Sequence, residues 1–221
     1  MAFRNQFAQF KHQVIALTLL GILTFTFAFP IQTYALEETT TLPTLSEFIQ
    51  TVKDGTPNAL RGIYVAGVMA HPIIQQPMGY PGYVSEASDT ITQFSIASEV
   101  GNLGLLAHNY LAGANFFQII PGNIITLVYG DGRTQSFLVG DIQRYQALSP
   151  LSPYSDFRDL ETESILTAEQ LFNQVYRGEF HLTLQTCIEN EGNSSWGRLF
   201  IIAKPVIEKS IDPVNFAYID V

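Results

Sequence analysis

The sequence predicts a mainly β domain that closes into an antiparallel or mixed barrel, with one or two short helices. Of its 221 residues, 47% are hydrophobic and only 14% are charged, which is typical of one well-packed globule and not of a disordered chain. Ile, Val, Thr, Phe and Tyr recur in short runs between Gly and Pro, as they do in strands. Many short strands with few helical stretches favour a closed barrel.

The first 35 residues have the features of an export segment. Arg4, Lys11 and His12 precede an apolar run of 16 residues from Val14 to Phe29, and Thr33-Tyr34-Ala35 is a small-residue cleavage pattern. The run is short for a membrane span, which needs about 20 residues. The pattern therefore leaves both a cleaved signal peptide and an uncleaved membrane anchor open. Either one predicts an extracytoplasmic protein, anchored at the cell surface or secreted.

Residues 36–59 are rich in Thr, Glu and Pro, and we interpret them as a tether between the membrane and the domain. A short helix is expected within them, around Leu45 to Val52. The folded domain is predicted to cover residues 60–221.

Strand signals follow one another through the domain. A glycine-bearing loop, Gly130-Asp131-Gly132-Arg133, separates two apolar runs and predicts a hairpin. Thr167 and Gln170 form a capping box for a helix that reaches Tyr176. The expected strands cover residues 63–69, 90–94, 104–108, 124–129, 135–142, 181–187 and 199–203.

The charge balance limits the possible partners. Residues 1–35 hold two basic and no acidic residues, so the remainder has 9 Lys+Arg against 20 Asp+Glu, a formal charge of −11. An acidic surface repels polyphosphate, which excludes nucleic acid as an expected partner. A basic or neutral peptide fits better.

The sequence contains a single cysteine, Cys187. One cysteine cannot form an internal disulfide, so in an exported protein it is either an inert buried residue or a reactive thiol. The four histidines and this cysteine never fall at the spacing of metal ligands, so no metal site is expected.

Three residues together have the chemistry of acyl transfer. A thiol becomes a strong nucleophile beside a base, and the reaction also needs a donor for the oxygen that becomes negative. Cys187 and His108 each end a predicted strand, and Arg198 precedes the strand after Cys187. We expect these rigid strand ends to bring the three side chains together.

These residues resemble the sortase family of cysteine transpeptidases. Thr183-Leu184-Gln185-Thr186-Cys187 matches the family's T-L-x-T-C signature, and Trp196-Gly197-Arg198 opens the next long strand as the family's arginine does. Leu106-Ala107-His108-Asn109 is similar to the setting of the family's histidine, although Ala107 replaces the usual glycine. The resemblance covers residues 60–206 in the order histidine, cysteine, arginine.

The resemblance implies an eight-stranded barrel that cleaves a sorting signal near the C-terminus of an exported protein. Cys187 would be the nucleophile, His108 the proton donor to the leaving amine, and Arg198 the group that stabilises the oxyanion. The acyl group would pass to an amine of cell wall or pilin. Thr186 and the loop from Tyr145 to Gly178 would shape the substrate groove.

The resemblance implies no cofactor. Some family members bind calcium near the groove, but Glu86, Asp89, Glu99 and Asp159 are too scattered to assign such a site.

Two further residues are placed with Thr186 as candidate substrate-binding residues, each with an alternative. Asn109 either orients His108 or caps the backbone, and Trp196 either lines the active site or closes the barrel. His71 and His181 are the alternative histidines; about 20 Å of strand separates His181 from Cys187.

Two other functions remain open on the sequence. An exported cysteine peptidase would use the same thioester with water as the acceptor. A non-catalytic surface β-domain would keep Cys187 inert.

Overall fold

The computed structural model describes residues 42–207, which contain ten strands, three α-helices and one 3-10 helix. Along the chain these are α2 (Leu45–Val52), β1 (Leu60–Val65), β2 (Met69–Gln75), β3 (Ile91–Gln93), α3 (Ser95–Glu99), β4 (Leu103–Leu106), the 3-10 helix η1 (Ala112–Gln118), β5 (Ile124–Tyr129), β6 (Thr134–Ala147), β7 (Phe157–Asp159), β8 (Ile165–Leu166), α4 (Ala168–Tyr176), β9 (Leu182–Asn190) and β10 (Asn193–Pro205).

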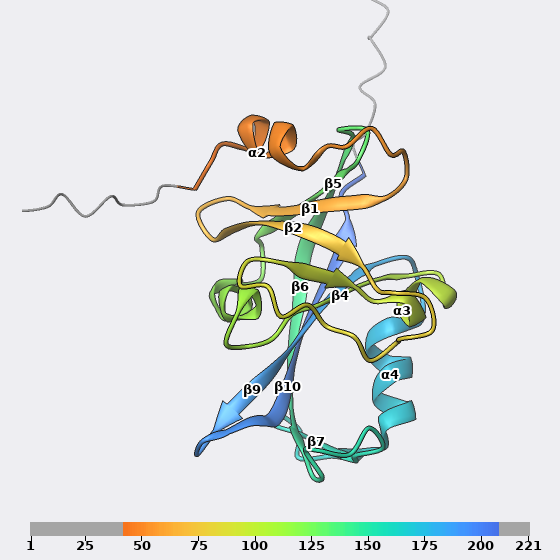
Figure 1. Cartoon of the computed structure of the whole chain (residues 1–221). Helices are drawn as coiled ribbons and strands as arrows, with labels where there is room; N and C mark the ends of the chain where they lie inside the picture. The colour runs from red at the N-terminus through yellow and green to blue at the C-terminus, as the bar shows by residue number, and fades with distance from the viewer. Residues whose placement is uncertain (1–41, 208–221) are drawn as a thin grey trace, which may run out of the picture. The chain divides into compact units, whose positions relative to one another are not determined.

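Eight of the strands form a closed ring. Their order is β10–β9–β4–β3–β2–β1–β5–β6, and β6 pairs back onto β10 (Figure 1). The short strands β7 and β8 continue the sheet from β6 outside the ring. The predicted closed eight-stranded barrel is therefore confirmed. The helices are more numerous than the one or two predicted.

The ring is mixed. Most neighbours are antiparallel, but β2–β3 and β4–β9 are parallel pairs. The β4–β9 pair matters most for function, because it brings the end of β4 beside the T-L-x-T-C strand, with Leu106 opposite Gln185.

Two apolar cores stabilise the domain. The first fills the barrel with alternate side chains of its strands, among them Leu184 and Leu199, since a small barrel is packed by its own interior residues. The second lies outside the barrel, where α4 covers β6 and β10; Tyr145, Val175 and Phe200 pack there. Burial of this second core holds α4 against β10, the strand that carries Arg198.

Both longer helices begin with a capping box. Thr44 and Glu47 cap α2, and Thr167 and Gln170 cap α4 as predicted. The apolar face of α2 lies on β1, with Phe48 buried over Gly62, where a Cβ atom would lie 2.7 Å from the phenyl ring. The described part of the predicted tether is thus packed against the barrel.

One predicted strand was wrong. Residues 63–69 were expected to be continuous, but β1 ends at Val65 and β2 begins at Met69. Gly67 has a φ of +72°, a conformation that glycine adopts without strain, and the Val68 amide donates to the Val65 carbonyl. The apolar run therefore makes a hairpin turn in place of one strand.

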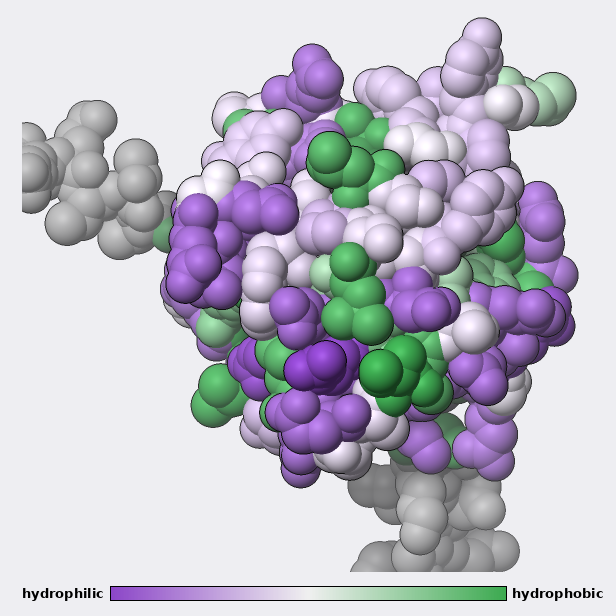
Figure 2. Space-filling view, turned by 90° about the horizontal axis from the view of Figure 1, so that it is seen from below, coloured by the Kyte–Doolittle hydropathy of each residue, from purple (hydrophilic) through white to green (hydrophobic). Residues whose placement is uncertain are grey.

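The segment between β6 and α4 forms the end of the molecule opposite α2, where the β9–β10 hairpin also projects (Figure 1). Figure 2 views the molecule from this end, and apolar patches lie there among polar residues. Leu151 and Ile165 are exposed in this segment.

None of the helices within residues 42–207 has the length and apolar character that a membrane span requires. The predicted export segment, residues 1–35, lies outside the described residues.

Candidate active site

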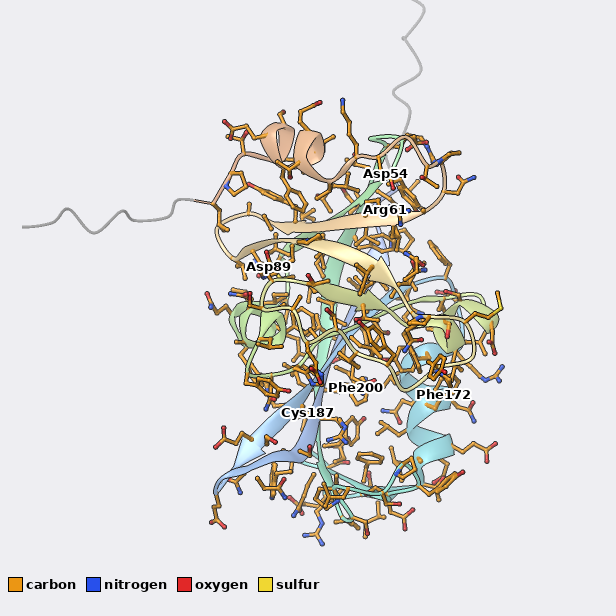
Figure 3. The ribbon with its side chains drawn as sticks, viewed as in Figure 1. Asp54, Arg61, Asp89, Phe172, Cys187 and Phe200 are labelled. Atoms are coloured by element: carbon orange, nitrogen blue, oxygen red, sulfur yellow. The ribbon has the colours of Figure 1, made fainter. Side chains whose placement is uncertain are left out.

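Cys187 lies opposite Arg198 in the β9–β10 ladder. Directly opposed residues of an antiparallel pair point to the same face, with Cβ atoms about 5 Å apart. Cys187 is a free, half-buried thiol, and Figure 3 shows it where β9 leaves the barrel. The prediction that Cys187 ends its strand and Arg198 begins the next was wrong, because both strands continue into the projecting hairpin.

His108 lies on the other side of β9. It follows β4 by two residues, so it does not end the strand as predicted. The parallel alignment continues past the strand, since the Ala107 amide donates to the Gln185 carbonyl at 3.2 Å. His108 is two residues beyond Leu106, as Cys187 is beyond its partner Gln185. Neighbouring strands lie about 4.8 Å apart, so histidine and cysteine leave adjacent chains at the same level.

Thr186 and Gly113 fix the backbone at His108. The buried Thr186 hydroxyl donates to the Ala107 carbonyl at 2.8 Å. The His108 carbonyl accepts hydrogen bonds from the amides of Leu111 and Gly113, which lead into η1. Gly113 allows this approach, since a Cβ atom there would lie 2.7 Å from the His108 oxygen. Thr186 therefore positions the histidine backbone.

The Arg198 guanidinium is held by its own strand. Nη1 donates to the carbonyls of Ser195 at 2.9 Å and Gly197 at 2.8 Å. The cation lies over the Phe157 ring, 6.0 Å from its centroid. Within residues 42–207 no carboxylate forms an ion pair with Arg198. The positive charge is therefore oriented but not neutralised.

A groove of about 400 Å³ runs along α4, with Arg198 in its wall. Most of its lining is apolar and comes from the segment between β6 and α4, α4 itself and β10, including Phe157, Phe172 and Phe200. Figure 3 shows Phe172 and Phe200 on α4 and β10. The loop from Tyr145 to Gly178, predicted to shape a groove, does line this one.

Gln185 and Tyr176 are groove residues that sequence reasoning missed. The Tyr176 hydroxyl donates to Gln185 Oε1 at 2.6 Å, and burial raises the pKa of Tyr176, so the hydroxyl stays protonated. Gln185 is the variable position of T-L-x-T-C, two residues before Cys187 and on the same face of β9. Because side chains alternate between the two faces of a strand, this two-residue spacing is the signal in the sequence that could have identified Gln185.

The structure places the remaining candidates as follows. Asn109 Nδ2 donates to the Ser194 carbonyl at 3.1 Å, which ties the histidine loop to the β9–β10 hairpin and not to the imidazole. Trp196 is half-buried in the irregular part of β10.

The other histidines have structural partners. His181 is buried, and its ring nitrogens contact the carbonyls of Glu179 and Val175 near the C-terminal end of α4. The His71 ring contacts Asn115 at 2.8 Å. Residues 42–207 contain no group of three or more His, Cys, Asp or Glu side chains arranged to hold a metal ion.

Sortases are among the solved structures that are similar to this chain. Sortase C1 of Streptococcus agalactiae is 16% identical with a TM-score of 0.42, and the match covers 72% of this chain and 74% of that one. Sortase C-1 of Actinomyces oris is 14% identical with a TM-score of 0.46, over 76% and 83% of the two chains. A sortase D5 transpeptidase of Clostridium perfringens is 13% identical with a TM-score of 0.44, over 75% and 90%.

No model of a known protein family matches the sequence, and no curated protein does.

Proposed function

We propose that the protein is an exported cysteine transpeptidase. It cleaves a sorting signal near the C-terminus of another exported protein and transfers the acyl group to an amine of cell wall or pilin. The observation that carries the proposal is the arrangement around β9: Arg198 lies opposite Cys187 on one side, and His108 leaves the neighbouring strand at the same level on the other.

The acylation step uses all three residues. The Cys187 thiol gives its proton to His108, and the sulfur attacks the scissile carbonyl while the carbonyl π electrons move onto oxygen. Arg198 donates hydrogen bonds to this oxyanion, a role suited to a cation that is oriented before substrate arrives. His108 then protonates the leaving nitrogen as the C–N bond breaks, which leaves a thioester on Cys187.

The groove beside Arg198 is the proposed site for the acyl-donor peptide. Its aromatic lining suits apolar side chains, and the Gln185 amide, two residues before Cys187 on β9, can donate to a carbonyl of the bound peptide. Asn109 and Trp196 remain proposed as residues of the substrate site, with Asn109 linking the histidine loop to the hairpin.

Intact-mass analysis with sorting-signal peptides tests the proposal. The full chain, kept in detergent because of its apolar residues 14–29, is incubated with a pool of such peptides with and without triglycine amide. We expect a thioester adduct that requires Cys187 and converts to a peptide–amine product. An adduct that yields only the acid would indicate a cysteine peptidase.

The remaining outcome is also informative. Absence of any adduct, together with a Cys187 thiol that resists iodoacetamide in the folded protein, would indicate a non-catalytic β-domain.

A further inference from the structure

A second hollow of about 400 Å³ lies beside His108. It is lined by Gly82, Tyr83, Val84, Glu86 and His108, which means that one carboxylate shares it with the proposed acid–base group. Gly82 and Val84 also line the groove that contains Arg198. The chain at residues 82–84 therefore borders both spaces, with the groove on the arginine side and the hollow on the histidine side.

The segment that borders the hollow is tied down. Gln76 Nε2 donates to the carbonyls of Pro81 at 2.8 Å and Tyr83 at 2.9 Å, while Gln76 Oε1 accepts from the amide and hydroxyl of Ser95. The buried Ser85 amide donates to Thr92 Oγ1 at 2.8 Å. Glu86 therefore extends from an anchored stretch of chain.

The side chains of His108 and Glu86 in the hollow are available to a ligand. The His108 ring stacks on Tyr110 with centroids 5.2 Å apart, and neither ring nitrogen is hydrogen-bonded to residues 42–207. The Glu86 carboxylate is exposed and forms no ion pair with the described residues.

We infer that this hollow binds the acceptor amine, and that Glu86 holds the amine in its cationic form. The inference rests on the proposed function. The histidine that protonates the departing amine must also accept the proton of the incoming amine, so both amines occupy the same side of the acyl group. That side is the His108 side, away from the groove. Primary amines are largely protonated at neutral pH, and a carboxylate attracts that charge.

The ammonium bound near Glu86 loses one proton to solvent, and its nitrogen lone pair attacks the thioester carbonyl. His108 takes a second proton from the nitrogen, the C–N bond forms and the C–S bond breaks. The electron pair of the C–S bond returns to sulfur, which leaves a thiolate beside a protonated imidazole.

The test is the partition of the thioester between transfer and hydrolysis. The full chain in detergent is acylated with the peptide that forms the Cys187 adduct, and the amide and acid products are measured against triglycine amide concentration. We expect Glu86→Gln to lower the ratio of transfer to hydrolysis about fivefold at subsaturating amine, while acylation is unchanged. Glu86→Lys should lower it further.

Two controls isolate the charge of Glu86. Asp89→Asn removes a carboxylate from the same loop; Asp89 lies well apart from Cys187 in Figure 3, so the partition should not change. Hydroxylamine is an uncharged nucleophile at neutral pH, and its transfer should not depend on Glu86.

An unchanged triglycine amide partition in Glu86→Gln would overturn the inference while leaving the transpeptidase intact. An equal loss with hydroxylamine would also overturn it, because the effect would not then depend on the charge of the amine. If wild-type protein forms no thioester, the proposed function fails and the inference fails with it.

Discussion

Arg198 is oriented by two backbone carbonyls before any substrate binds. Because Nη1 donates hydrogen bonds to the carbonyls of Ser195 and Gly197, the plane of the guanidinium is fixed. Its remaining N–H donors therefore point in one direction. A lysine has a point charge on a flexible stem and cannot reproduce this fork.

We therefore expect Arg198→Lys to be as impaired as Arg198→Ala, with kcat/KM lowered about 100-fold in steady-state assays, as for loss of an oxyanion donor. Arg158→Lys on β7 is the matched control, since Arg158 makes only a loose 3.8 Å contact with Glu163. Near-wild-type activity of the lysine variant would contradict the oxyanion role.

Tyr145 gives the fold a sensitivity to high pH. Burial, with the nearby negative charges of Asp159 and Asp141, raises the pKa of Tyr145 to about 12 from an ordinary value of 10.0. The folded protein therefore binds this proton more tightly than the unfolded chain does. Between pH 10 and about 12 the unfolded state ionises first, so the free energy of unfolding falls as pH rises.

Urea unfolding of wild type and Tyr145→Phe checks this sign. The hydroxyl also contacts Gln143 and Gln174, so the variant is expected to be less stable below pH 10. That difference should stay constant to about pH 10 and shrink towards pH 12, because phenylalanine does not ionise. A difference that stays constant to pH 12 would contradict the prediction.

At the scale of elements, η1 holds the backbone of His108 in place. Its Gly113 approaches Thr186 Oγ1 and the carbonyls of Ala107 and His108, and a Cβ atom would lie within 2.9 Å of all three. Two of these atoms are backbone, so they cannot move aside independently.

Gly113→Ala should cost about 1–3 kcal/mol of unfolding free energy, as overpacking does, and should also lower kcat by displacing His108. Gly140→Ala on β6 is the control, because its Cβ atom would meet nothing within 4 Å. Denaturant titration and kinetics on the two variants separate the effects; equal behaviour would show that η1 does not position the histidine.

Elements with strong local signals were predictable from sequence. The β5–β6 hairpin forms around the predicted glycine-bearing turn, and α4 begins at the predicted Thr167 capping box. The boundaries of β9 and β10 were not predictable, because these strands extend for as long as they pair with each other beyond the barrel.

The same distinction holds for the site. Motifs identified Cys187, His108 and Arg198 as candidates, but the groove and the hollow depend on packing between distant segments. Glu86 and His108 share a space because the chain after β2 folds back beside the end of β4. No periodicity or spacing in the sequence indicates that these two residues line one space.

At the scale of the whole molecule, α2 and the site lie at opposite ends of the barrel (Figures 1 and 3). Phe48 packs on β1 over Gly62 and away from the site, so its effect should be on stability alone. Phe48→Ala is expected to lower the free energy of unfolding by about 3 kcal/mol, as deletion of a buried aromatic ring does.

Gln50→Ala, at an exposed position of α2, serves as the control. Both variants should retain wild-type kcat/KM at temperatures where they remain folded. A selective loss of activity in Phe48→Ala would show that the two ends of the barrel are coupled.

The closing pairs of the ring have a consequence for biosynthesis. β10 completes the barrel by pairing with both β9 and β6. β4 can pair with β9 only after the chain has continued for more than 70 further residues. Such distant pairings form late in folding. A polypeptide that emerges from the ribosome N-terminus first holds its histidine long before its cysteine and arginine. The nascent protein therefore cannot assemble the proposed active site, and the proposed activity requires that β10 is available.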